Sequence, residues 1–276
     1  MTYTYEISDG RRGIDSKITF IDALNGEPVL GLNSFQTVFD RAESLIYNEY
    51  SAVSKGAISN VRGNWYEWLL ALGTIEFKNE TPDANYLLPL PNISQYDCAK
   101  LYSEEIYSYI RDLRIKVKSS SGASLITSNP DFVIVEKGLE VKLPDIVQND
   151  LTPHVIEEID QMYLQLEHKC LLDQLIGYAA AKSSLRPDRR LQIAHEGSLM
   201  KALYRHVQTR EWLIDARGIK YFAITSAATS ADRNALKTIA THSIVDVSSK
   251  PEAAVDDLFC VFSGQELRTA LELMLT

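Results

Sequence analysis

The chain has 276 residues, 45% of them hydrophobic and 24% charged, which is the balance of an ordinary globular protein and excludes a disordered or largely membrane-embedded chain. Its formal net charge of −9 argues against nucleic-acid binding over the whole surface, because phosphates are neutralised by Lys and Arg. No apolar run reaches the length of a membrane span, and residues 1–13 lack the apolar core of a signal peptide. We therefore expect a cytoplasmic protein without membrane contact.

The first half of the chain is expected to be mostly helical. Ser34 is a suitable N-cap for a helix over about 35–50, where apolar residues recur at helical spacing. Further helices are expected over 64–78 and about 97–117. Between these two, Asn, Asp and Pro residues enclose a short strand over 86–90.

The second half alternates strands with helices. Pro187 stands at the first position of a long helix over 187–207, where its missing N–H has no cost. Strands are expected over 125–127, 132–135, 178–182, 220–225 and 244–247, and further helices over 157–170, 230–238, 252–260 and 264–274. This alternation predicts an α/β core. Residues 1–276 would form a single domain, either undivided or with a helical N-terminal subdomain over about 1–120.

The segment 182–210 is basic within an acidic chain. It holds seven Lys and Arg residues and two acids, a balance of +5. A cationic stripe of this kind can face DNA while the acidic remainder keeps the protein in solution. Arg190, Lys201 and Arg205 are candidates for contacts with a DNA backbone. The ordinary alternative is a solvated helix face whose ion pairs contribute little.

Three ionisable residues suit the hydrolysis of a phosphodiester. That reaction needs cations held by carboxylates, an oriented water and neutralisation of the developing charge. Asp131 opens a strand and offers oxygen ligands suited to Mg²⁺, Lys182 ends the strand over 178–182, and Glu196 lies within the long helix. Each has an ordinary alternative, because Pro-Asp marks many strand boundaries and a lysine after a buried strand often only caps its edge.

The start of the same helix carries residues suited to base recognition. Arg pairs with guanine O6 and N7 in the major groove, and Asp accepts from cytosine N4. Arg186, Asp188 and Arg189 would then read a G/C-rich half-site. Arg189 and Glu196 are seven residues apart and leave the same helix face. One helix would thus carry both base recognition and a carboxylate of the metal site.

Four sequence blocks, taken together, resemble a known group of enzymes. They are GNWYEWL (63–69), SNPDF (128–132), KSSLRPDRRLQIAHEGSLMKALY (182–204) and LKTIATHSIVDV (236–247). The blocks resemble the CCGG-type type II restriction endonucleases of the PD-(D/E)XK nuclease superfamily, over about residues 63 to 258. The resemblance implies an α/β fold with a mixed sheet flanked by helices and a mostly helical N-terminal part.

The resemblance also implies roles for the site residues. The superfamily pattern has an acid two residues before the catalytic lysine, but that position is Ala180 here. In the CCGG-type enzymes the missing carboxylate comes from the following helix, which matches Glu196. Asp131 and Glu196 would then bind Mg²⁺, and Lys182 would be the catalytic lysine. Glu67 matches an additional acidic residue of the family, and its alternative is a capping or buried acid beside two tryptophans.

Recognition and assembly are implied by the same resemblance. Arg186, Asp188 and Arg189 match the R-x-D-R determinant that reads CCGG in the major groove. The implied enzyme is a homodimer in a prokaryotic cytoplasm, with tetramers among some relatives, that cuts both strands of a palindromic DNA site and leaves 5′ CCGG overhangs. Trp212 could serve a tetramer interface, although a core tryptophan is the more frequent explanation.

A competing motif and two competing functions remain open. Glu140-Val141-Lys142 follows Asp131 closely and spells the ordinary superfamily motif better than Ala-Ala-Lys does. Because Gly138 indicates a tight turn and no reading helix adjoins the motif, we interpret it as a charged turn. A non-specific or repair-type PD-(D/E)XK nuclease would need the same metal site without the Arg/Asp code. A DNA-binding protein that does not cut is the other alternative.

Overall fold

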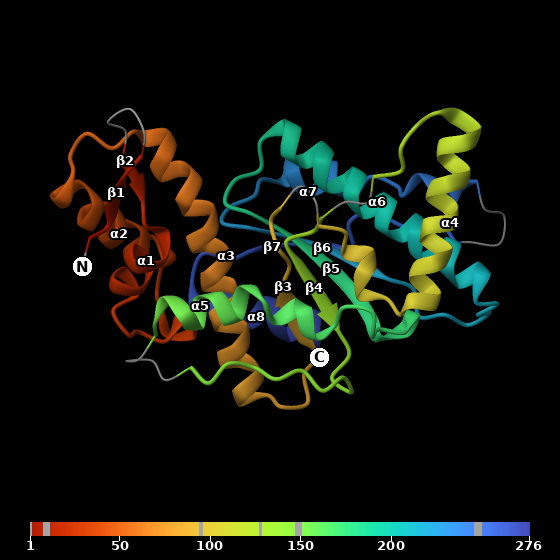
Figure 1. Cartoon of the computed structure of the whole chain (residues 1–276), viewed down its shortest axis with the longest axis horizontal. Coiled ribbons are helices and arrows are strands. Elements are labelled where there is room, and N and C mark those ends of the chain that lie inside the picture. Colours follow the sequence, from red (N-terminus) through yellow and green to blue (C-terminus); the bar gives the residue numbers. More distant parts are fainter. Residues whose placement is uncertain (1, 8–11, 94–95, 127–128, 147–150, 246–249) are drawn as a thin grey trace. The chain divides into compact units, whose positions relative to one another are not determined.

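The computed structural model describes the whole chain except residues 1, 8–11, 94–95, 127–128, 147–150 and 246–249 (Figure 1). The chain divides into two compact units. The first consists of Met1–Ala84, Lys142–Asp160 and Val261–Thr276, and the second of Asn85–Val141 and Gln161–Cys260. Each unit is therefore assembled from segments far apart in the sequence. The region over about 1–120 contributes to both, with the division after Ala84.

The first unit is mainly helical and contains one long helix, α3 (Lys55–Glu80). Its other main elements are β1 (Thr4–Glu6), β2 (Arg12–Ile14), α1 (Ser16–Leu24), α2 (Phe35–Glu49), α5 (Pro153–Asp160) and α8 (Gly264–Leu275). The helix expected over 35–50 is confirmed as α2, with Ser34 as its N-cap. The helix expected from residue 64 begins earlier, because Ser54 provides the N-cap of α3.

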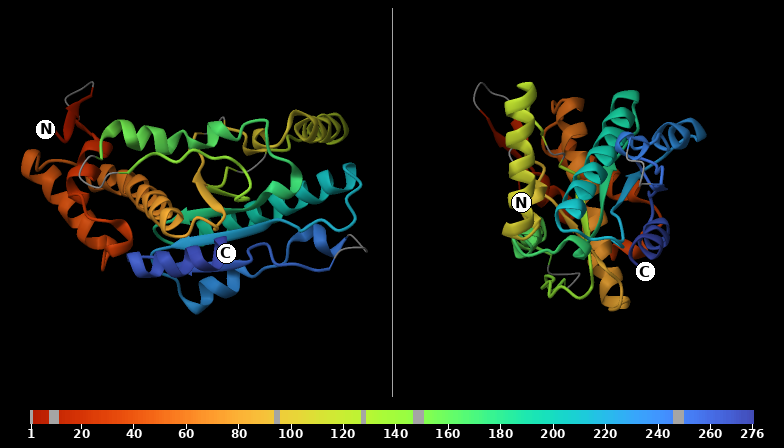
Figure 2. Two further views of the ribbon diagram at one scale, coloured as in Figure 1. Left: turned by 90° about the horizontal axis from the view of Figure 1, so that it is seen from below. Right: turned by 90° about the vertical axis from the view of Figure 1, so that its right-hand side faces the viewer.

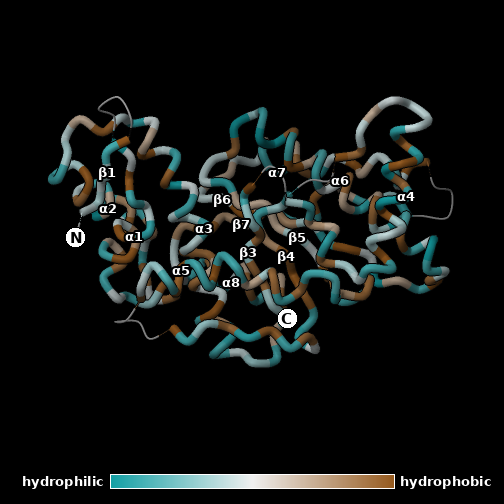
Figure 3. Tube along the Cα trace, in the orientation of Figure 1, coloured by the Kyte–Doolittle hydropathy of each residue, from teal (hydrophilic) through white to brown (hydrophobic). Residues whose placement is uncertain are grey.

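The second unit contains a five-stranded sheet in the order β3-β4-β5-β6-β7. Its strands are β3 (Tyr86–Pro89), β4 (Phe132–Val135), β5 (Leu175–Lys182), β6 (Lys220–Thr225) and β7 (Asp257–Cys260). The sheet is mixed, because β3, β4 and β5 pair antiparallel whereas β5, β6 and β7 pair parallel. The strands β4, β5 and β6 are almost entirely buried, which explains their continuous apolar sequences (Figure 3).

The helix α6 (Pro187–Arg210) follows β5 after a short loop and precedes β6, so β5, α6 and β6 form a parallel crossover unit. It begins at Pro187 as predicted. The helix packs on β6, and α4 (Glu104–Ser121) and α7 (Ser230–Leu236) pack against it (Figures 1 and 2). Because β4 runs antiparallel to β5, the start of β4 and the end of β5 lie at the same edge of the sheet.

The prediction of a helix over 252–260 is wrong. Residues Asp257–Cys260 instead form β7, which extends the sheet beside β6. The helix expected over 157–170 ends at Asp160 and is followed by a 3-10 turn over Met162–Gln165. In both places the local spacing of apolar residues is compatible with a helix, and contacts with distant segments decide otherwise.

Two expected strands also differ. Ile244 ends a 3-10 helix (Thr241–Ile244) and Val245 is its C-cap, and the remaining residues of the strand expected over 244–247 lie outside the described part of the chain. Residues 125–126 belong to no strand, and residue 127 is likewise outside the described part. Among the described residues, no helix combines the length and the apolar character needed to cross a membrane.

Candidate active site

The start of β4 and the end of β5 bring Asp131 and Lys182 together. Because Phe132 pairs antiparallel with Ala179, Asp131 and Lys182 lie at the same edge of the sheet. Lys182 Nζ lies 2.7 Å from Asp131 Oδ2 and 3.0 Å from Oδ1, and the backbone N–H of Ala181 donates to Oδ2 at 2.7 Å. The Asp131 side chain is only 5% exposed, so these donors offset the cost of burying its charge.

A second carboxylate comes from α6. Ala180 shares a side of β5 with Lys182, because side chains alternate along a strand, and its buried methyl group offers no ligand. Glu196 is buried on α6. Its Oε2 accepts from the Tyr221 hydroxyl at 2.9 Å, and its Oε1 accepts from the Gln192 amide at 2.9 Å. The Glu196 side chain therefore points toward β6 rather than into solvent.

A glycine next to this carboxylate lets α6 approach its neighbours closely. A Cβ at Gly197 would lie 2.1 Å from the Ala254 carbonyl oxygen and 3.1 Å from Tyr221 Cδ1. No residue with a side chain fits there without moving the backbone. Gly197 therefore sets the spacing between α6 and β6, and with it the reach of Glu196.

The hydroxyl of Tyr221, on β6, is influenced by both carboxylates. Burial raises the pKa of its hydroxyl well above the usual range, and the negative charge of Glu196, its hydrogen bond and the charge of Asp131 raise that pKa further. Both carboxylates therefore act on the same protonated hydroxyl. The direct contacts are those of Lys182 with Asp131 and of Tyr221 with Glu196, and the charge of Asp131 also reaches the Tyr221 hydroxyl.

The oxygen donors of this region fit a divalent cation. Within the described residues, no three His, Cys, Asp or Glu side chains are grouped as a complete protein cage for a metal. Mg²⁺ does not need such a cage, because it is usually bound by one or two carboxylates together with waters and substrate phosphates. Asp131 and Glu196 would be the two carboxylates of such a site.

Glu67 belongs to the first unit, on α3, and is half-buried next to the buried side chains of Tyr66 and Trp68. Its predicted part in the site is not tested by the geometry of the second unit and stays a prediction.

The residues expected to read bases stand at the start of α6. Arg186 is the residue before the first turn, and its Nη2 lies 3.2 Å from Asp188 Oδ2, with 65% and 66% of the two side chains exposed. Arg189 Nη1 makes a long contact of 3.4 Å with the Ser184 carbonyl oxygen. Arg186 and Asp188 are therefore in contact and exposed, whereas Arg189 is half-buried.

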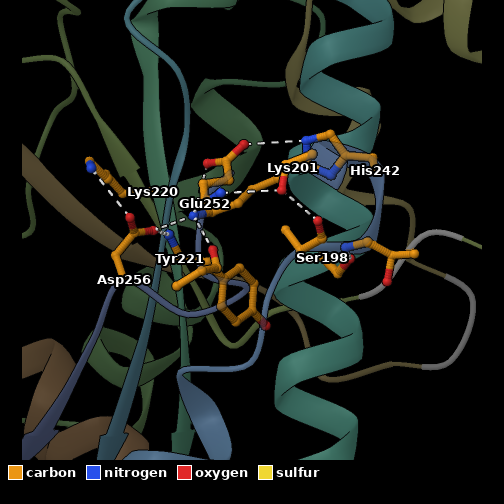
Figure 4. A network of polar contacts seen from close by, with 11 residues as sticks. Ser198, Lys201, Lys220, Tyr221, His242, Glu252 and Asp256 are labelled. Atoms are coloured by element: carbon orange, nitrogen blue, oxygen red, sulfur yellow. Dashed lines mark hydrogen bonds and ion pairs between the residues drawn. The ribbon is translucent and has the colours of Figure 1, made fainter. Parts of the chain in front are cut away.

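The expected cationic stripe along α6 is interrupted. Lys201 does not fit its predicted role as a DNA-backbone contact, because its side chain is 2% exposed and its Nζ is held by Glu252 at 3.2 Å and Asp256 at 2.8 Å (Figure 4). Arg190 pairs with Asp232 at 2.9 Å. Arg205 is half-buried and donates to a glutamine of the same helix. Among the Lys and Arg residues of 182–210, all of them described, only Arg186 at the helix start is exposed.

The competing motif at residues 140–142 follows the opposite end of β4 from Asp131. A turn over residues 137–138 comes between the strand and Glu140, which is exposed. Lys182, in contrast, is in direct contact with Asp131. The geometry favours Lys182 as the partner of this aspartate.

Sequence reasoning missed Tyr221. A tyrosine inside an apolar strand looks like an ordinary core residue, and its contact with Glu196 spans 25 residues of chain. No local pattern indicates such a contact, since it depends on how closely α6 packs on β6.

Comparison with known proteins identifies the class. The family model described as "Cfr10I/Bse634I restriction endonuclease" matches residues 25–276. The type II restriction enzyme Cfr10I of Citrobacter freundii is 37% identical over 272 residues, covering 95% of both chains. A structure of the Bse634I restriction endonuclease superposes with a TM-score of 0.85 at 30% identity, covering 98% of this chain and 96% of the other.

A crystal structure of the type IIF restriction endonuclease Bse634I with cognate DNA superposes with a TM-score of 0.84 at 28% identity, covering 99% of this chain and 97% of the other. The predicted α/β fold, with a mixed sheet flanked by helices, is confirmed. The protein is a type II restriction endonuclease. More particularly, the chain belongs to the Cfr10I/Bse634I restriction endonuclease family.

Proposed function

We propose that the enzyme cuts both strands of DNA at a palindromic site that contains CCGG, in a reaction that depends on Mg²⁺. The observation that carries this proposal is the contact of Lys182 with the buried carboxylate of Asp131, and the buried carboxylate of Glu196 on α6 supports it. The exposed Arg/Asp cluster at the start of α6 supports the recognition of G·C pairs. The relative Bse634I has been crystallised with cognate DNA, which supports double-stranded DNA as the partner.

Each site residue would have its own role in hydrolysis. Asp131 and Glu196 would hold Mg²⁺, and Glu67 is a further acidic candidate. A divalent cation supplies charge neutralisation at the phosphate and a more acidic water. Lys182, whose side chain is 22% exposed, would turn its ammonium toward the scissile phosphate or the attacking water. In-line attack of water on phosphorus then breaks the P–O3′ bond and leaves a 5′-phosphate and a 3′-hydroxyl.

A palindromic site implies two subunits related by a twofold axis, each reading one half with Arg186, Asp188 and Arg189. Cleavage before the first cytosine of each strand would leave 5′ CCGG overhangs. Arg190 and Arg205 remain candidates for backbone contacts. The prokaryotic cytoplasm is the expected location, because the DNA substrate lies there.

A tetramer is the second assembly that we propose. Trp212 follows α6 with φ 55°, the left-handed conformation that favours glycine at a helix end, and it is 87% exposed. The explanation of Trp212 as a core residue is therefore wrong. Leu213 and Ile214, next in the chain, are 38% and 91% exposed. Sedimentation of the wild type and of Trp212→Ala would test the interface, and equal masses would contradict it.

Digestion of a plasmid tests the central proposal. We expect discrete fragments in the presence of Mg²⁺ and none when EDTA is added. Sequencing of the fragment ends should show CCGG as a 5′ extension at each terminus. Ends of unrelated sequence would contradict the recognition assignment, and cleavage that persists in EDTA would contradict the metal assignment.

A further inference from the structure

The hydroxyl of Tyr221 holds the carboxylate of Glu196 from the interior of the unit. Tyr221 is fully buried in β6, and its hydroxyl donates to Glu196 Oε2 at 2.9 Å. The other oxygen, Oε1, accepts from Gln192, which is exposed on the surface of α6. One oxygen of the carboxylate is thus fixed by a rigid core residue, and the other by a side chain that can move away.

The backbone N–H and carbonyl of Tyr221 are both hydrogen-bonded to Asp256. Its N–H donates to Asp256 Oδ2 at 2.8 Å, and its carbonyl accepts from the Asp256 N–H at 2.7 Å. Asp256 also pairs with Lys201 at 2.8 Å and with Lys220 at 3.3 Å (Figure 4). A shift of the tyrosine along the strand would break both of its hydrogen bonds to Asp256, which two lysines hold in place.

Lys201 connects Asp256 to α6, the helix that carries Glu196. It lies little more than one turn after Glu196 on α6, and its buried ammonium contacts the Ala253 carbonyl at 2.7 Å as well as Glu252 and Asp256. Glu252 is paired on its other side with His242 at 3.3 Å (Figure 4). α6 is therefore joined to β6 directly through the Glu196 carboxylate and indirectly through Lys201, whose partner Asp256 contacts Lys220 and Tyr221.

We propose that Tyr221 is a positioning residue for Glu196: its hydroxyl orients the carboxylate so that the Oε1 side faces the cation and the reacting phosphate. Residues that hydrogen-bond a metal ligand fix its orientation, and their loss costs about 10- to 100-fold in metal affinity or activity. This inference rests on the proposed function, in which Glu196 is a metal ligand.

The experiment removes one oxygen atom. Tyr221→Phe keeps the ring and deletes the hydroxyl, so the core volume is nearly unchanged. Tyr178→Phe is the matched control, because Tyr178 pairs with Tyr221 in the neighbouring strand and is equally buried, and the residues that raise its pKa are tyrosines and cysteines rather than Glu196. The affinity of both variants and of the wild type for Mg²⁺ is measured by titration calorimetry with an uncleavable duplex that contains CCGG, and their cleavage rates are measured over a Mg²⁺ titration at saturating DNA.

We expect Tyr221→Phe to need about 10- to 100-fold more Mg²⁺ for half-maximal cleavage, with much of the rate recovered at high Mg²⁺. Tyr178→Phe should keep the wild-type requirement. An unchanged Mg²⁺ requirement in Tyr221→Phe, or the same shift in both variants, overturns the inference.

Glu196→Gln separates this inference from the proposed function. If that variant cleaves with the wild-type Mg²⁺ dependence, Glu196 is not a metal ligand and the proposed site fails. If Glu196→Gln weakens the response to Mg²⁺ but Tyr221→Phe does not, the site stands and only the positioning role of Tyr221 fails.

Discussion

The start and the middle of α6 are built in opposite ways. At its start, Arg186 and Asp188 are 65% and 66% exposed and meet in a surface contact of 3.2 Å, a kind of pair that contributes little in water. Further along, Glu196 and Lys201 are buried, and both are held by groups from other elements. One helix therefore combines a loosely held surface cluster with a tightly held interior.

This difference matches two tasks. Side chains that read bases lose their hydration and adjust their conformation to the DNA groove on binding. A side chain that is not held by other protein groups before binding can make this adjustment. Groups that hold a cation and a reacting phosphate act best when they are already in place. We infer that the helix is fixed where the chemistry takes place and adaptable where the sequence is read.

The largest effect is expected at Lys182, the last residue of β5. Lys182→Ala removes a cation from the developing charge on the phosphate, and loss of one such stabilising group typically lowers the rate by about 10²- to 10³-fold. Single-turnover cleavage of a duplex that contains CCGG measures this loss. Lys142→Ala is the matched control from the competing motif and should cleave normally. Loss of cleavage in the Lys142 variant alone would reverse the assignment of the catalytic lysine.

A somewhat smaller effect is expected on folding. Lys201→Met leaves Glu252 and Asp256 without their buried partner, and breaking a buried pair costs about 3–5 kcal/mol. Because the Glu252 and Asp256 side chains are 41% and 20% exposed, we expect the lower end of that range in the free energy of unfolding. Urea denaturation measures the change. Lys237→Met, at an exposed position, should remain close to the wild type. Equal stability of both variants would show that the buried network is not needed for folding.

The smallest effect is expected at the adaptable end. Arg189→Ala should leave the fold intact, because the side chain makes a single long contact of 3.4 Å. A bidentate contact between Arg and guanine discriminates by about 1–3 kcal/mol, so the preference for CCGG over an altered duplex should fall by that amount. Competition binding at fixed salt measures this loss of preference. For comparison, Asp131→Ala should bind CCGG specifically without cutting it. Normal discrimination by the Arg189 variant would mean that other residues read the site.

The sequence by itself determined much of the framework. Pro187 and Ser34 mark the starts of helices, and the apolar runs over 132–135 and 220–225 predict buried strands, because caps and buried runs are local properties. The resemblance of the motif blocks also indicates the enzyme class.

Only the tertiary structure decided which charged groups are accessible. Lys201 appears on α6 as one more basic residue, yet its partners lie about fifty residues further along the chain and draw it into the interior. β7 forms a strand because β6 offers it an edge, and Tyr221 meets Glu196 because Gly197 allows a close approach. Burial and pairing of this kind depend on packing between segments distant in sequence, which no local pattern of residues contains.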